Sequence, residues 1–155
     1  MIGLCRPALR MLPALVAAIF FAFFAACGSS GITRARVERA VASTFANLVQ
    51  VQLERMGLGP VPPPGIRVVA NCRRMTPGRE DGGSGDWACA LTWYGPNRTP
   101  LVDAYDVSIA ADGCYTASVG AGEGNLGGPT IPMRDGTRIR NVLYAFDGCL
   151  DSRTR

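Results

Sequence analysis

The side chains that most enzymes use for proton transfer are scarce in this chain. The sequence contains no His and no Lys, which excludes imidazole bases, imidazole metal ligands and lysine Schiff bases. The remaining acid–base groups are carboxylates, and Glu80, Asp81 and Asp86 share a short Gly-rich segment. Paired carboxylates serve glycoside hydrolases, and carboxylate loops bind calcium. This segment therefore supports one hypothesis, a small hydrolase, while the simpler interpretation is a solvated loop.

Cysteine is the other reactive side chain, and Cys27 has an informative position. It follows an uncharged apolar run, residues 11–26, which is preceded by Arg6 and Arg10. A positive start, an apolar stretch and small residues at a cleavage point are typical of a secretory signal. The run is shorter than the roughly 18 to 20 residues that cross a bilayer. We therefore expect residues 1–26 to be a removable signal peptide.

The residues around the cleavage point indicate that Cys27 is lipidated. Phe-Ala-Ala precedes it and Gly-Ser-Ser follows it, an arrangement that resembles a bacterial lipobox, although Phe24 stands where Leu is usual. The resemblance implies two or three acyl chains, palmitate among them, and two or more chains anchor a protein stably. We expect residues 27–31 to form a short tether on the outer face of the cell membrane. The alternatives are plain secretion and a retained anchor helix.

Four cysteines remain once Cys5 and Cys27 are set aside: Cys72, Cys89, Cys114 and Cys149. An exported protein lies in a compartment that permits disulfides, and four cysteines allow three connectivities. The preferred pairs are Cys72–Cys89 and Cys114–Cys149, because each pair flanks segments that we expect to be neighbours. Free buried thiols are the alternative. Zinc is disfavoured because the chain has no Cys-x-x-Cys and no His, so we expect no metal and no cofactor.

The charge balance bears on possible partners. All 16 basic residues are Arg, against 12 acids in 155 residues, and this small excess does not predict nucleic-acid binding. Arg34, Arg36 and Arg39 lie within a dozen residues of Cys27, so they are candidate contacts for anionic lipid headgroups. The alternative is an ordinary solvated helix face, with Arg34 paired to Glu38. A mature chain of residues 27–155 suits one domain, residues 32–155, after the tether.

A helix and several strands are expected to position these groups. Thr33 can cap a helix that ends near Met56, before Gly57 and Pro60. Its apolar side chains recur at steps of three to five. The residues that form this stripe are Val37, Val41, Phe45, Leu48, Val51 and Met56.

The rest of the sequence predicts mainly antiparallel strands. Alternating or β-branched segments predict strands over residues 66–72, 87–94, 101–110 and 114–119. In the second of these, Trp87 and Trp93 share a face, and Tyr94 lies on the other. Pro129 and Pro132 predict irregular structure, residues 139–146 fit either a strand or a helix, and residues 147–149 predict a turn. The fold class expected is α+β, with one helix on a sheet of four or five strands and two disulfides.

Residues 68–72 (VVANC) and 86–89 (DWAC) carry a family resemblance. Together with the lipobox and the helix, they are similar to small actinobacterial lipoproteins of uncharacterised function, in which a helix precedes an antiparallel sheet. The resemblance covers roughly residues 32–119, and this chain departs from it in lacking Pro after Cys72 and in its long tail. It implies no catalytic residues.

The leading hypothesis is a non-enzymatic, membrane-anchored binding domain whose partner is an envelope protein or glycan. The alternatives are an envelope hydrolase that uses the loop carboxylates, and a secreted inhibitor-like module without lipid.

Overall fold

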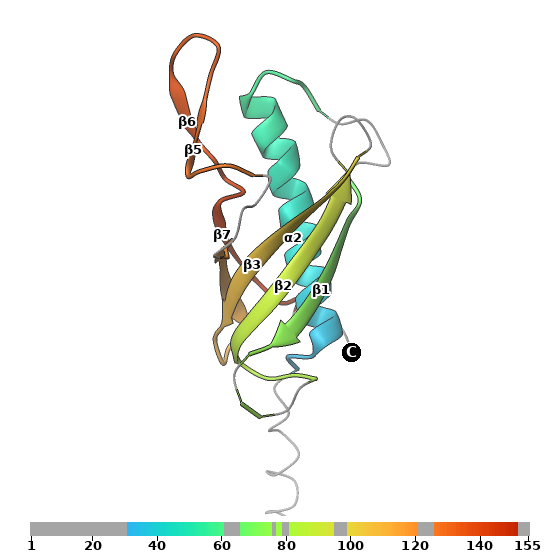
Figure 1. Cartoon of the computed structure of the whole chain (residues 1–155). Helices are drawn as coiled ribbons and strands as arrows, with labels where there is room; N and C mark the ends of the chain where they lie inside the picture. The colour runs from blue at the N-terminus through green and yellow to red at the C-terminus, as the bar shows by residue number, and fades with distance from the viewer. Residues whose placement is uncertain are drawn as a thin grey trace, which may run out of the picture.

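The structure is a computed structural model that describes residues 31–60, 66–75, 77–78, 81–94, 99–120 and 126–151. One helix packs on one face of a five-stranded antiparallel sheet, and a small two-stranded hairpin extends beside it (Figure 1). This confirms the α+β fold class. The expected signal peptide and Cys27 lie outside the described residues, as does Glu80.

The helix α2 spans Arg34–Arg55, as the sequence predicts. Thr33 caps it in an extended conformation, and its hydroxyl accepts from the amide of Arg36 at 3.4 Å. After the C-cap Met56, Gly57 takes a φ of 72°, a left-handed conformation that costs glycine little and other residues more. The cap residues that the sequence offers therefore set both ends of the helix.

The buried stripe of α2 differs from the prediction at its C-terminal half. Its residues are Val37, Val41, Phe45, Val49 and Gln52. Val51, which was expected in the stripe, is 37 % exposed, and Leu48 is only partly buried. Several apolar residues follow one another here, so helical spacing alone could not decide which of them faces the sheet.

The main sheet has the order β1-β2-β3-β4-β7, with every neighbouring pair antiparallel. Its strands are Val68–Arg74, Gly85–Tyr94, Pro100–Ile109, Cys114–Val119 and Ala145–Cys149. The first four correspond to the predicted strands within two residues at each end. Figure 1 shows α2 lying along the sheet behind β1 and β2.

The two faces of this sheet have different surroundings. The covered face, which we define as the side toward α2, carries buried side chains from alternate positions. Phe45 of the helix meets Trp93 and Tyr105 edge to face, with ring centroids 5.7 and 5.8 Å apart. Phe146 of β7 packs against two of these rings, those of Phe45 and Tyr105. The alternation of Trp87 and Trp93 toward the core is therefore confirmed.

The C-terminal region corrects three expectations. Pro132 closes a short strand, β5 (Thr130–Pro132), which pairs with β6 (Arg138–Arg140). Strand β7 (Ala145–Cys149) includes residues 147–149, for which a turn was predicted. Asn141 separates β6 from β7: its side-chain amide donates to the carbonyls of Leu126 and Gly128, and its Oδ1 accepts from the amide of Leu143. These bonds bend the chain, so residues 139–146 are two strands with a turn between them.

Candidate functional site

The two expected disulfides are present, Cys72–Cys89 and Cys114–Cys149, with Cα–Cα distances of 4.1 and 3.8 Å. Each joins directly opposed residues of neighbouring strands. The preferred connectivity is therefore confirmed, and each edge strand of the sheet is joined to its neighbour by a disulfide.

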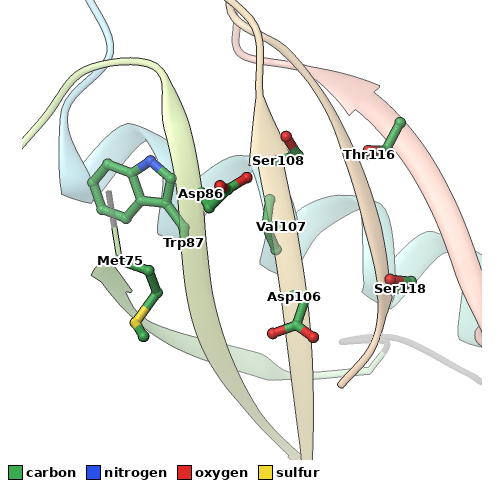
Figure 2. A pocket seen from close by; sticks show the side chains of 8 residues that line it. All are labelled: Met75, Asp86, Trp87, Asp106, Val107, Ser108, Thr116 and Ser118. Atoms are coloured by element: carbon green, nitrogen blue, oxygen red, sulfur yellow. The ribbon is translucent and has the colours of Figure 1, made fainter. Parts of the chain in front are cut away.

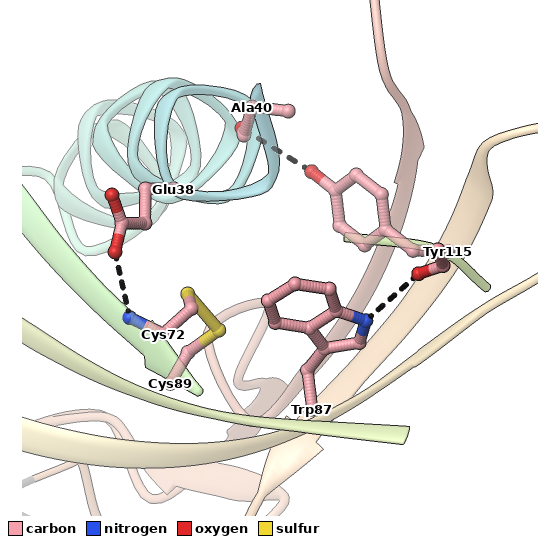
Figure 3. Close-up of a disulfide and its surroundings, with 7 residues drawn as sticks. Glu38, Ala40, Cys72, Trp87, Cys89 and Tyr115 are labelled. Atoms are coloured by element: carbon pink, nitrogen blue, oxygen red, sulfur yellow. Dashed lines mark hydrogen bonds between the residues drawn. A yellow bond between two sulfur atoms is a disulfide. The ribbon is translucent and has the colours of Figure 1, made fainter. Parts of the chain in front are cut away.

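The Cys72–Cys89 disulfide belongs to the covered face. Both cysteines are almost fully buried, and the amide of Cys72 donates to Oε1 of Glu38 at 3.1 Å (Figure 3). Cys72 lies in the edge strand β1, and its amide points away from β2 toward Glu38, so without this carboxylate it would lack a partner. The helix therefore satisfies part of this edge with a carboxylate.

On the opposite side of the sheet, which we call the open face, no helix of the described residues lies. A polar row crosses one end of it, in which each residue is the cross-strand partner of the next. The row consists of Asp86, Ser108, Thr116 and Asp147. Asp106 and Ser118 form a second opposed pair beside it. Several of these side chains line a shallow depression of about 330 Å³ (Figure 2). Carboxylates and hydroxyls suit hydrogen bonds to a cationic or polar group.

The other end of the open face is apolar. Val69, Tyr94 and Val102 are 60 %, 51 % and 55 % exposed. Val69 and Val102 both pair with Thr92, so they flank β2 in one cross-strand row. Tyr94 lies on the face predicted for it, away from the two tryptophans. Aromatic side chains are enriched at protein contact surfaces, and the two exposed valines extend the apolar area around Tyr94.

The structure separates the carboxylates that the sequence grouped in one loop. Asp86 is the second residue of β2 and lies on the open face, where its partner is Ser108. Asp81 precedes Gly82, and its carbonyl accepts from the amide of Arg34 at 2.9 Å. Within the described ranges, no group of three or more His, Cys, Asp or Glu side chains is placed to hold a metal.

The three candidate lipid-contacting arginines occupy different settings. The guanidinium of Arg36 donates to the carbonyls of Gly31 and Asp151, which joins the start of the domain to its end. Arg34 and Arg39 are exposed. Arg36 and Arg39 also line a small surface pocket with Ser43 and Asp151. The Arg36 side chain thus has a structural role that the sequence did not suggest.

Besides Asn141, two buried polar residues were missed by sequence reasoning. Asp103 is fully buried, and its Oδ2 accepts from Nε1 of Trp93 at 2.8 Å. Gln52 is 3 % exposed, and its Oε1 accepts from the amide of Val142 at 2.9 Å. The alternation of β3 places Asp103 between Leu101 and Tyr105 on the covered face. The strand pattern of the sequence could therefore have predicted that Asp103 is buried.

Tyr105 is a further buried polar group of the covered face. Its hydroxyl donates to the carbonyl of Leu143, and burial, with a smaller contribution from the charge of Asp103, raises the pKa of this phenol. The pKa of Tyr115 is also raised, chiefly by burial. Both groups hold the fold together and do not face the open side.

No described helix is both long and apolar enough to cross a membrane. Comparisons with protein-family models, curated proteins and solved structures found no match to this chain.

Proposed function

We propose that the chain is a membrane-anchored, extracytoplasmic lipoprotein whose domain binds another protein of the cell envelope and is not an enzyme. The anchor is Cys27, and the lipobox-like sequence around it supports this assignment. Two disulfides in a small domain are consistent with an oxidising compartment outside the cytoplasm.

One observation carries the binding proposal: Val69, Tyr94 and Val102 are exposed together on the open face of a sheet that two disulfides cross-link. A rigid surface loses little conformational entropy on binding, which favours affinity. The depression beside Asp86 is shallow, whereas small-molecule sites are concave and enclose most of their ligand. A broad protein contact therefore fits this face better than a small substrate does.

The direction of the strands sets the orientation of this face relative to the anchor. Thr33, at the start of α2, pairs with Gly82, just before β2, so the chain enters the domain at the end that holds Asp86. Ten residues of β2 span about 30 Å, so Tyr94 lies roughly that far from the entry point. The apolar patch thus points away from the proposed anchor.

The test is capture of partners from intact cells that carry the wild-type protein or Val102→Asp, with Leu58→Asp as a control at an exposed position outside the sheet. We expect Val102→Asp to lose a captured envelope protein that Leu58→Asp and the wild type retain. Identical captured proteins for all three forms would contradict a role for the open face.

The anchor has a separate test. Mass spectrometry of the mature N-terminus should find an acylated Cys27, and Cys27→Ala should release the protein from the membrane fraction. An unmodified N-terminal cysteine would favour the secreted inhibitor-like module. An uncut signal would favour the anchor helix.

The hydrolase hypothesis is retained as a second candidate because Asp86 and Asp106 both line the depression on the open face. Complementation by Asp86→Asn together with Asp106→Asn separates the two functions. We expect the double variant to complement as the wild type does, and loss of complementation with retained partner capture would favour the enzyme.

A further inference from the structure

We propose that the hairpin arm is a second docking element, which takes up an extended acidic segment of a partner protein as an added strand on β6. The hairpin arm is the pair β5 and β6, residues 130–140, which projects past the C-terminal end of α2 (Figure 1). It lies at the end of the domain away from Thr33, and it is separate from the open face.

The hydrogen-bond pattern of the arm shows which backbone groups remain available. The amide of Met133 donates to Thr137, and the amide of Asn141 donates to Pro129. Antiparallel pairs alternate between bonded and non-bonded, so the bonded pair between these two is Ile131 with Ile139. The amides and carbonyls of the non-bonded residues, Arg138 and Arg140 among them, therefore point outward from the arm.

The two edges of the arm differ in what they offer. On β5, the outward-facing positions are Thr130 and Pro132, and proline has no amide to donate. On β6, Arg138 and Arg140 each present both an amide and a carbonyl. An incoming strand can therefore pair fully along β6 and only partly along β5.

The positive charge of the arm indicates that the partner strand is acidic. Arg134, Arg138 and Arg140 are all exposed, against one acid, Asp135. That carboxylate accepts from both the amide and the hydroxyl of Thr137, which lowers its pKa and uses it to shape the turn. Guanidinium groups pair well with carboxylates, so the complementary strand is acidic.

Self-pairing is disfavoured by the same side chains. If two copies paired β6 with β6, arginines would face arginines across the new ladder, and directly opposed like charges destabilise a sheet. Arg138 is also held in place, since its Nε and Nη2 donate to the hydroxyl of Thr130 at 2.9 and 2.6 Å. The arm thus presents a cationic edge to a different chain, with the Arg138 guanidinium fixed over the face of the arm by Thr130 of β5.

The probe is a fluorescent ten-residue peptide of alternating Glu and Val, titrated into the full-length protein in detergent. In antiparallel pairing, the residues opposite Arg138 and Arg140 turn their amides toward β6 and their side chains toward the guanidiniums. N-methylation of the Glu residues should therefore abolish binding, while N-methylation of the Val residues should leave it unchanged. Equal binding of both methylated peptides would overturn strand addition.

Protein variants test the same edge from the other side. Arg138→Gln with Arg140→Gln should weaken peptide binding about tenfold, while Arg34→Gln with Arg55→Gln, which removes two exposed charges from α2, should not. Arg140→Pro removes the outward amide and should weaken binding further than Arg140→Gln does. Since that amide makes no bond to β5, the arm should still form, as circular dichroism and thermal melting can show.

Two other outcomes would also overturn the proposal. One is wild-type affinity in the double Gln variant. The other is binding to polyphosphate or phosphatidylglycerol vesicles without binding to the peptide, which would indicate a general anion surface. Val102→Asp on the open face should leave peptide affinity unchanged, so this test and that of the proposed function can fail separately.

Discussion

The two disulfides join neighbouring strands in the same way, yet they lie on opposite faces of the sheet. Cys72 and Cys89 lie beneath α2 at 1 % and 2 % exposure, among the rings of the core. Cys114 is partly buried and Cys149 is exposed, and both alternate with buried residues of β4 and β7 toward the open face. One bond is part of the packed interior, and the other braces a surface.

This difference shows how each face of a small sheet is stabilised. The covered face is held by burial, because Phe45, Trp93, Tyr105 and Phe146 exclude water together. Among the described residues no second layer covers the open face, so on that side burial contributes little to holding the short edge strand β7. A covalent bond to β4 takes over that role, which keeps the open face ordered and still accessible.

The largest expected effect comes from Phe45→Ala, which empties the centre of the covered face. We expect a loss of about 3 to 5 kcal/mol in the free energy of unfolding, from lost burial and the cavity left behind. Tyr94→Ala on the open face should change it by less than about 0.5 kcal/mol. Urea denaturation of both variants checks the comparison, and similar losses would contradict it.

Removing each disulfide sharpens the comparison. With sequence separations of 35 and 17, loop closure predicts losses of about 4 kcal/mol for Cys114→Ala/Cys149→Ala and about 3 kcal/mol for Cys72→Ala/Cys89→Ala. The buried pair should lose more than its loop predicts, because it also leaves a cavity. A limited dithiothreitol pulse followed by alkylation should label Cys114 and Cys149 first, since a reductant can reach them. Prior labelling of Cys72 would contradict this.

Because two phenols are buried on the covered face, we expect the free energy of unfolding to depend on pH in the alkaline range. Folding raises the pKa of Tyr105 and of Tyr115, so the folded state keeps protons that the unfolded state loses above about pH 10. Stability from these phenols is complete below that pH and falls as pH rises, by up to about 1.4 kcal/mol per pH unit for each group. Urea midpoints measured from about pH 9 to about pH 11, on either side of the ordinary phenol pKa, give the slope.

Tyr105→Phe provides the matched control for the alkaline slope. It removes one titrating phenol and keeps the ring that packs against Phe45 and Phe146. The slope should fall by about half. A slope that Tyr105→Phe leaves unchanged would assign the alkaline effect to other groups.

The smallest expected effect concerns the bond between the helix and the edge strand. Glu38→Ala leaves the amide of Cys72 without its acceptor and should cost about 1 kcal/mol. Glu38→Gln keeps an oxygen in place and should cost less. Thermal unfolding of the two variants compares them, and an equal loss in both would indicate that charge, not the hydrogen bond, is what matters at this position.

Much of the fold could be predicted from sequence because its signals are local. The cap Thr33, the stop at Gly57 and the alternation around Trp87 and Trp93 set α2 and β2 close to their observed bounds. The C-terminal region lacked such signals. Residues 139–146 fit either a strand or a helix, and the bend at Asn141 depends on carbonyls of Leu126 and Gly128, which are distant in the sequence.

The candidate site was less predictable than the fold. Asp86 was grouped with Asp81 because they are close in sequence, whereas the sheet places Asp86 in a row with Ser108, Thr116 and Asp147. This row forms only when β2, β3, β4 and β7 pair in the observed register. The outward edge of the hairpin arm likewise depends on which residues of β6 pair with β5.

The sequence by itself determined the helix, four strands and the preferred pairing of the cysteines, because capping, periodicity and residue type act over a few neighbours, while the anchor at Cys27 stays a prediction. Only the tertiary structure decided which face of the sheet is covered, which disulfide is buried, and which arginine joins the ends of the domain. Those outcomes depend on contacts between segments far apart in the chain, such as Arg36 with Asp151, and no local pattern encodes them.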